Sequence, residues 1–363
     1  MIRNIFLSLG FVALVATGGG PTAQAQQVTL PRPSPHTVLT QTVGITEITV
    51  DYSRPQVKDR EIWGQVVPYG MQQVNFGGKG MAPWRAGANE NTIITLSTDV
   101  MVEGEPLAAG SYGLHMVLSE DQSVTVIFSK NTSSWGSFWY KEEEDALRVQ
   151  VQAEEAPHTE LLTYDWVAYA GNSATLALSW EKLRIPIQFE VDLVNTVMVN
   201  LRDEMRGQAG FSAQAQVAAA NFCYQNQTHQ KEGIAWAQQS GAAQPSFNAF
   251  ALEGLLYAQL EQGTEAATAM DKALAYASPP QVNFLAYQLL PLNPEKAVEY
   301  FQQNVKGNPE NPNFHDSLGE GYLALGQDRD AIKSFRKALA LDPPQNVREN
   351  SEKNLRELGV DID

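Results

Sequence analysis

The 363-residue sequence has little of several residue types, and each shortage narrows what the protein can be. It has one cysteine, Cys223, so an internal disulfide and a cysteine-based metal cluster are excluded. Lys and Arg number 25 against 41 Asp and Glu, a formal net charge of −16. A chain of this sign is disfavoured as a binder of nucleic acid, whose phosphates attract basic proteins. Attraction to an anionic membrane surface is disfavoured for the same reason.

Only one stretch of the chain is strongly apolar, and it stands at the N-terminus. Arg3 precedes the apolar run of residues 5–16, and residues 23–25 (AQA) fit the small-x-small rule for signal cleavage. The run is short for a membrane span. We therefore predict a signal peptide over residues 1–25, no transmembrane anchor after its cleavage, and a periplasmic or secreted protein that begins at Gln26. An uncleaved anchor is the alternative.

Signatures of catalysis and of cofactor binding are also missing. The sequence has no Gly-x-Ser-x-Gly elbow, no phosphate loop and no dinucleotide fingerprint, and its 5 histidines lack the spacing of a zinc site. We therefore assign no catalytic residue, metal or cofactor. The rival interpretation is a hydrolase of envelope or polysaccharide material with His115, Arg85 and Glu90 in its site. A metal held by His36, His115 and Glu90 is a further alternative.

Residues 30–193 show the alternation of apolar and polar residues that is typical of β-strands. In the longest stripe, Ile185, Ile187 and Phe189 share one face. Many short strands with one buried face, separated by tight turns, predict an all-β antiparallel sandwich of about eight to ten strands.

One long segment, residues 53–92, breaks this alternation and is rich in Gly and Pro. Long loops on a rigid β scaffold often carry function. Arginine offers a planar fork to carboxylate or phosphate, and tryptophan can stack on a ligand. We therefore predict that the loop over residues 54–90 recognises a small polar or anionic ligand. The candidate residues are Arg54, Arg60, Trp84, Arg85, Asn89 and Glu90 from the loop and His115 from a strand.

The same arginines have a purely structural interpretation. Each could pair with a nearby carboxylate and fix the loop to the sandwich, because structural ion-pair networks resemble functional sites. The nearby carboxylates are Asp51, Asp59, Glu61 and Glu90. In that case the chain would be a structural envelope protein in which all three arginines are buried and paired.

After residue 193 the apolar period becomes that of a helix. Residues 194–211 predict a connecting helix, and residues 212–363 predict an all-α array of helical hairpins. The last hairpin, residues 312–343, has small and aromatic residues where two helices would meet. These are Leu318, Gly319, Tyr322, Gly326, Ala331, Phe335, Ala338 and Pro343. Weaker copies precede it, and residues 348–358 predict a polar capping helix.

Both halves resemble known families. Residues 52–55 (YSRP), 58–64 (KDREIWG) and 84–90 (WRAGANE) resemble a family of secreted bacterial proteins catalogued as domain of unknown function 2911. The resemblance covers about residues 30–193, except that residues 71–81 look like a longer Gly-rich insertion. It implies export and a domain boundary, and it implies no reaction.

The last hairpin is similar to a tetratricopeptide repeat, with His315 in place of the first aromatic residue. That resemblance implies a concave groove that holds a protein or peptide partner. A short array could instead only support the β half. Together the two halves predict an exported binding and scaffold protein of the cell envelope.

Overall fold

The computed structural model describes residues 30–361, and its N-terminal half is a sandwich of two antiparallel sheets. In spatial order, the larger sheet contains β1 (His36–Val43), β2 (Thr46–Ser53), β5 (Ile93–Leu96), β8 (Gly110–Leu118), β9 (Ser123–Ser129) and β10 (Asp145–Gln152). The smaller sheet contains β11 (Glu154–Ala170), β12 (Ser173–Glu190), β6 (Val100–Val102) and β7 (Glu105–Leu107). The predicted antiparallel sandwich is thus confirmed.

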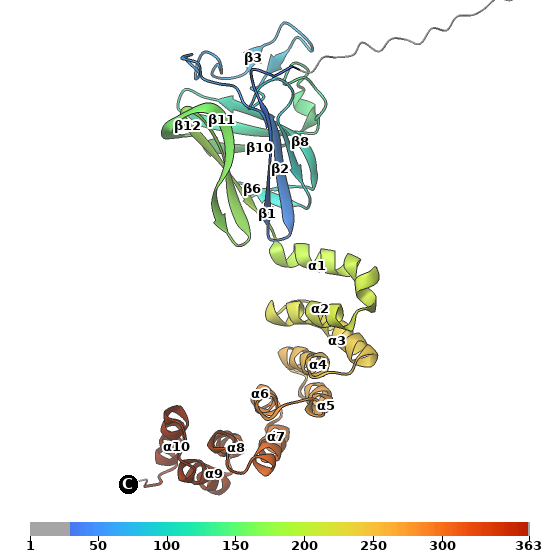
Figure 1. Ribbon diagram of the computed structural model, residues 1–363, viewed down its shortest axis with the longest axis vertical. Coiled ribbons are helices and arrows are strands. Elements are labelled where there is room, and N and C mark those ends of the chain that lie inside the picture. Colours follow the sequence, from blue (N-terminus) through green and yellow to red (C-terminus); the bar gives the residue numbers. More distant parts are fainter. Residues whose placement is uncertain (1–29, 362–363) are drawn as a thin grey trace, which may run out of the picture.

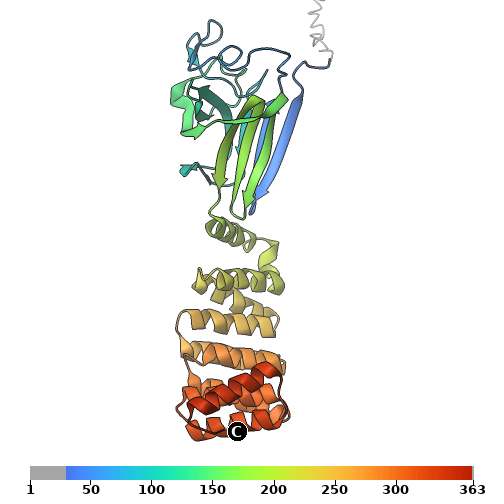
Figure 2. The ribbon, with the colours of Figure 1, turned by 90° about the vertical axis from the view of Figure 1, so that its left-hand side faces the viewer.

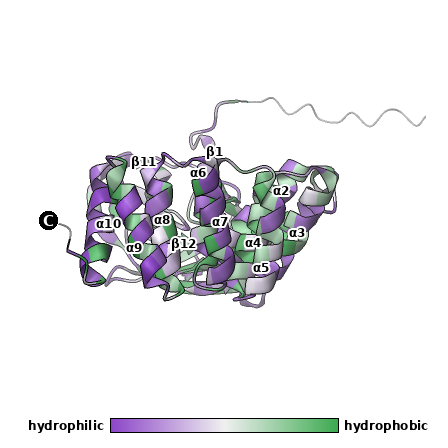
Figure 3. Cartoon of the chain, turned by 90° about the horizontal axis from the view of Figure 1, so that it is seen from below, coloured by the Kyte–Doolittle hydropathy of each residue, from purple (hydrophilic) through white to green (hydrophobic). Residues whose placement is uncertain are grey.

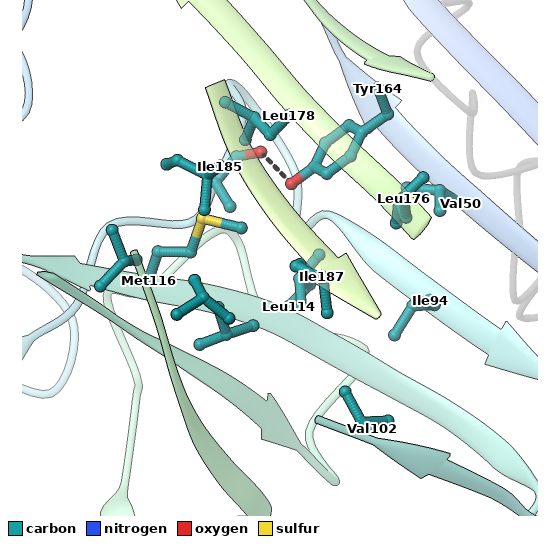
Figure 4. Close-up of a cluster of buried hydrophobic side chains, with 14 of the residues drawn as sticks. Val50, Ile94, Val102, Leu114, Met116, Tyr164, Leu176, Leu178, Ile185 and Ile187 are labelled. Atoms are coloured by element: carbon teal, nitrogen blue, oxygen red, sulfur yellow. Dashed lines mark hydrogen bonds between the residues drawn. The ribbon is translucent and has the colours of Figure 1, made fainter. Parts of the chain in front are cut away.

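The core of the sandwich consists of the residues that alternation places on the inner faces of the two sheets. Leu114 and Met116 of β8 point toward Ile185 and Ile187 of β12, and all four side chains are buried (Figure 4). Burying apolar area of this kind is the main favourable contribution to folding. Tyr164 of β11 is also buried in the core, and the dashed line in Figure 4 starts at its hydroxyl group.

A short hairpin, β3 (Gln72–Gln73) and β4 (Met81–Ala82), extends the end of the sandwich farthest from the helices (Figure 1). Its Gly-rich tip packs on the segment before β10, where the Gly78 amide donates to the Phe138 carbonyl at 2.7 Å. A Cβ atom at Gly77 would lie 2.7 Å from the same carbonyl oxygen. This approach needs glycine, so the tip is fixed to its neighbour.

The C-terminal half is a stack of helices (Figures 1 and 2). In chain order they are α1 (Leu193–Glu204), α2 (Ala213–Gln225), α3 (Gln230–Ala243), α4 (Phe247–Gln259), α5 (Gly263–Leu274), α6 (Pro279–Leu289), α7 (Pro294–Gly307), α8 (Pro312–Ala324), α9 (Asp328–Ala340) and α10 (Gln345–Glu357). The 3₁₀ turns η1 (Glu142–Glu144) and η2 (Gln208–Phe211) precede β10 and α2. From α2 onward the helices form antiparallel hairpins, as the sequence predicts.

Small residues bring the two helices of a hairpin together. A Cβ atom at Gly319 of α8 would lie 2.5 Å from the Phe335 ring of α9, and one at Gly254 of α4 would lie 2.6 Å from Met270 of α5. Side chains therefore fill the space that each glycine leaves, which is the close helix packing that the spacing predicts. Figure 3, viewed from below, shows hydrophilic residues prominent on the outer surfaces of α7 and α9.

Helix α1 joins the two halves and contacts both. Asp192 caps its first turn by accepting a hydrogen bond from the Asn195 amide at 3.0 Å. Leu193 packs against Gly44 in the turn between β1 and β2, where an added Cβ would lie 2.5 Å from it. On the other side, the Met198 sulfur lies 3.7 Å from the Cys223 sulfur in the first helical core. Burial raises the pKa of the Cys223 thiol to about 11, so this cysteine is a packing residue.

The helices curve, with α4, α6, α8 and α10 on the inner side and α5, α7 and α9 on the outer side (Figure 1). The last helix is held by polar contacts to α8: Ser351 donates to Asp316 at 2.5 Å, and Asn350 donates to Asp316 at 2.9 Å and to Glu320 at 2.8 Å. No helix in the described part of the chain is long and apolar enough to cross a membrane. The predicted signal peptide lies outside the described residues.

Candidate functional site

A pocket of ≈600 Å³ is lined in part by Gln72 of β3 and Ala82 of β4. These strands lie at the end of the sandwich opposite the helical array (Figure 1). Its lining includes four of the seven predicted site residues: Arg60, Trp84, Arg85 and Asn89. The long loop therefore builds a hollow of the size that small-molecule sites have.

The turn that carries Trp84, Arg85 and Asn89 is anchored firmly to the sandwich. The backbone of Trp84 exchanges two hydrogen bonds with Met116 of β8, at 2.9 and 2.8 Å. The buried hydroxyl of Tyr164 donates to the Ala86 carbonyl at 3.0 Å. Rigid anchoring keeps the pocket side chains in one arrangement, which lowers the entropic cost of binding.

Arg85 is the half-buried cation of this pocket. One of its terminal nitrogens donates to the Asn89 carbonyl, and its guanidinium carbon lies 5.1 Å from the centre of the Phe138 ring. Among the described residues Arg85 forms no ion pair with a carboxylate, and burial lowers the pKa of its guanidinium. A desolvated cation without a carboxylate partner favours an anionic ligand.

Gly136 packs closely against the Arg85 guanidinium. Gly136 has a φ of +59°, and a Cβ atom there would lie 2.4 Å from the guanidinium carbon. The absence of a side chain at this position therefore leaves room for Arg85.

The electrostatic character of the pocket is opposite to that of the whole chain. The lining residues found in the described part include three cations, Lys58, Arg60 and Arg85, and no carboxylate. The chain as a whole has a net charge of −16. The concentration of positive charge in one hollow favours anions at that place.

Three tryptophans pack together at the pocket, and two of them line it. The rings of Trp84 and Trp180 are stacked with centroids 6.0 Å apart, and Trp63 meets both edge-on at 5.8 and 5.9 Å. Trp180 is buried, whereas Trp63 and Trp84 are partly buried and pack against the core. Trp84 and Trp180 line the pocket, so they offer an apolar surface to a ligand.

The ion pairs expected for the structural alternative are not formed. Arg54 instead donates to the Leu162 carbonyl at 2.9 Å and to the Thr163 hydroxyl at 2.6 Å, which ties the loop to β11. Arg60 donates to the carbonyls of Val57 and Gln56 within its own turn. Backbone carbonyls can hold an arginine in place without neutralising its charge, so the carboxylate-paired interpretation is wrong.

The alternative metal site of His36, His115 and Glu90 is not assembled. His36 lies 2.5 Å from Asp51, and Glu90 forms an ion pair with Arg32 at 2.6 Å. Within residues 30–361 no group of three or more His, Cys, Asp or Glu side chains could hold a metal ion. Glu90 and Arg54 do not line the pocket, although both flank residues that do.

His115 is buried and does not line the pocket. Its Nδ1 lies 2.8 Å from the hydroxyl oxygen of Ser137, a residue that does line it. Burial, and secondarily the charge of Arg85, lowers the pKa of His115 to about 4. His115 is therefore neutral at pH 7 and is a weak base.

Several lining residues were not predicted as site residues. Ser137 and Phe138 come from the segment before β10, about fifty positions after Arg85, and no local pattern marks them. Trp180 comes from β12, where the alternation marks it as a strand residue and not as part of a site.

The fold and the site define the class of protein: an antiparallel sandwich with a loop-built cationic pocket, followed by an array of helical hairpins. Residues 34–189 match the model of a family described as protein of unknown function, DUF2911. Residues 312–344 match the model of the tetratricopeptide repeat. Both resemblances seen in the sequence are thus confirmed, in the same order along the chain.

Solved structures similar to the chain include tetratricopeptide proteins. A crystal structure of MamA is 16% identical to this chain, with a TM-score of 0.34. The match covers 41% of this chain and 89% of the MamA chain. MamA of Desulfovibrio magneticus RS-1, from residue 41 to its end, is 17% identical to this chain, with a TM-score of 0.33. The match covers 42% of this chain and 86% of that one. YrrB, described as a TPR protein with an unusual peptide-binding site, is 18% identical to this chain, with a TM-score of 0.32. The match covers 43% of this chain and 82% of YrrB. A comparison with curated proteins gives no match.

The fit of Arg85 against Gly136 gives a stability prediction. We expect Gly136→Ala to lower the free energy of unfolding by more than Gly171→Ala does. The two glycines have φ of +59° and +60°, but only at Gly136 would the added Cβ atom meet another residue. The shared backbone strain costs about 1 kcal/mol. Urea unfolding of both variants measures the difference, and equal losses would contradict the packing described.

The buried neutral His115 gives a pH prediction. Because its folded pKa of about 4 is below the unfolded value of 6.5, its stabilising effect is complete above pH 6.5 and is lost as the pH falls toward 4. The full effect is on the order of 3 kcal/mol. We expect wild type to lose stability relative to His115→Gln across this range, measured by urea unfolding at each pH. His158→Gln, at an exposed histidine of β11, is the control and should follow wild type.

Proposed function

We propose that this protein is an exported binding and scaffold protein of the cell envelope. In this proposal the β-domain pocket binds a small organic anion and the helical array holds a protein partner. The observation that carries the first part is Arg85, a half-buried guanidinium without a carboxylate partner that lines a hollow of ≈600 Å³. The export part rests on the predicted signal peptide.

The chemistry of the lining specifies the ligand further. An anionic group on the ligand would replace the hydration that the Arg85 guanidinium loses when it is buried. The charge-assisted hydrogen bond that forms is stronger than one between neutral groups. Trp84 and Phe138 provide flat apolar surfaces next to the cation. The lining therefore suits a molecule with one charged group and one flat or ring-shaped part.

The helical half supports the scaffold part of the proposal. A tetratricopeptide repeat is matched at residues 312–344, and arrays of this type are scaffolds for protein–protein interaction. The helices α4, α6, α8 and α10 form the inner side of the curve (Figure 1). The β3–β4 hairpin, which helps to line the pocket, lies at the opposite end of the molecule. The two binding surfaces would therefore be open at the same time.

The geometry favours binding over hydrolysis. The rival site required His115, Arg85 and Glu90 together, but Glu90 pairs with Arg32 outside the pocket. Ser137 and His115 do form a hydrogen bond, yet no hydrogen bond or ion pair among the described residues joins His115 to a carboxylate. A histidine with a pKa of about 4 activates a hydroxyl poorly at neutral pH.

Thermal unfolding tests the anion site. We expect inorganic phosphate, benzoate, galacturonate or glucose 6-phosphate to raise the Tm of the mature wild-type chain at constant ionic strength, whereas benzamide, galactose and glucose do not. Arg85→Met should lose the increase, because the guanidinium supplies the attraction. Arg206→Met, which removes one exposed positive charge in the segment after α1, should show the same increase in Tm as wild type.

Three results would overturn the anion site: no anion of the panel raises the Tm, the neutral analogues raise it equally, or Arg85→Met responds like wild type. Because the comparison uses the increase caused by each compound, a lower starting Tm of the variant does not affect it.

Site-specific photocrosslinking in cells tests the scaffold part. We expect a photoreactive phenylalanine at Phe284, exposed on the inner helix α6, to capture a protein partner. The same residue at Gln303, exposed on the outer helix α7, should not. Equal crosslinking at both positions, or none at either, would rule out a partner on the inner side of the curve.

A further inference from the structure

A patch of exposed aromatic rings adjoins the pocket. Phe138 lines the pocket, and its ring centre lies 5.7 Å from that of Phe76 and 6.5 Å from that of Trp139. Phe76 and Trp139 also contact each other, at 5.8 Å. Phe76 is 65% exposed and Trp139 is 42% exposed. We call Phe76, Phe138 and Trp139 the aromatic rim.

The aromatic rim is held in position by the backbone. The Gly78 amide donates to the Phe138 carbonyl, so the hairpin that carries Phe76 is fixed to the segment that carries Trp139. Exposed large rings do not contribute their full burial energy to folding. A fixed cluster of such rings beside a pocket is typical of a binding surface.

The aromatic rim is continuous with the charge in the pocket. The Arg85 guanidinium carbon lies 5.1 Å from the Phe138 ring centre, and Phe138 contacts both exposed rings. One path therefore leads from a cation without a carboxylate partner to two rings that face solvent. A ligand that follows this path has an anionic group at one end and a further flat unit beyond it.

We propose that the pocket and the aromatic rim together bind an acidic oligosaccharide. The carboxylate of one sugar unit contacts Arg85, and the next unit packs against the exposed rings of Phe76 and Trp139, which are inclined to each other at 71°. This inference rests on the proposed anion site and specifies its ligand.

The polar lining supports a sugar as the occupant. Gln56, Gln72 and Asn89 line the pocket, and each amide offers both a donor and an acceptor to hydroxyl groups. Exposed aromatic rings also pack against the apolar faces of sugar rings, and the aromatic rim offers such rings beyond the pocket. An anionic membrane is the weaker candidate, because the chain as a whole carries a charge of −16.

Calorimetric titration of the mature chain with trigalacturonate, galacturonate and neutral maltotriose tests the inference. We expect the trimer to bind at least about tenfold more tightly than the monomer, which corresponds to about 1.4 kcal/mol. Maltotriose should bind neither wild type nor the variants measurably.

Substitution of the exposed rings separates the aromatic rim from the pocket. We expect Phe76→Ala and Trp139→Ala to lower the affinity for the trimer to that for the monomer and to leave the monomer affinity unchanged. Tyr169→Ala, at a 59% exposed ring on β11, is the control and should keep the wild-type preference. Circular dichroism confirms that each variant is folded.

The outcomes distinguish this inference from the proposed function. A trimer that binds no more tightly than the monomer, or a preference that survives both ring substitutions, overturns the acidic oligosaccharide. Tighter binding of a triglutamate peptide than of trigalacturonate also overturns it. If phosphate or benzoate binds through Arg85 and galacturonate does not, the oligosaccharide falls and the anion site stands. If no anion binds, both fall.

Discussion

The contact between Arg85 and Gly136 is the constraint on which the pocket depends. It joins two segments that belong to different parts of the chain, one after β4 and one before β10. The first segment is fixed by the backbone bonds of Trp84 to β8 and by the Tyr164 hydroxyl. Because the first segment is fixed in this way, the guanidinium stays half buried beside the Phe138 ring, where it lines the hollow. Movement of either segment would expose Arg85 to solvent and remove the preference of the pocket for anions.

Much of the fold could be predicted from the sequence because its patterns are local. Alternation marks the strands of the sandwich, and the spacing of Gly319, Phe335 and Ala338 marks a helical hairpin in which glycine lets an aromatic ring approach. The pocket was predictable only in part. Trp84, Arg85 and Asn89 stand in one short motif, whereas Ser137 and Phe138 reach the pocket through strand pairing across the larger sheet. Long-range pairing leaves no trace in a local window. The burial of His115 was missed for the same reason, since the residue that it bonds, Ser137, is distant in sequence.

The loop arginines show why residue type alone does not define a role. Arg54 and Arg60 satisfy backbone carbonyls and hold turns together, whereas Arg85 combines such a bond with an open face toward the hollow. The same side chain serves as a brace in one position and as a candidate ligand contact in another. Arg60 lines the pocket as well, but both of its hydrogen bonds described above hold its own turn, whereas Arg54 lies outside the pocket. The two roles are separated by packing and not by composition.

Helix α1 has a consequence for how the two halves would act together. Asp192 caps it, Leu193 seats it on the turn between β1 and β2, and Met198 places it in the first helical core. A connector held at both ends acts as a spacer rather than a flexible tether. A molecule that binds a polymer at one end and a protein partner at the other would then be bivalent. It would raise the effective concentration of the partner along the polymer, although the two ligands occupy separate sites. Tight binding at either pole would not be needed, because anchoring at one end keeps the other end within reach.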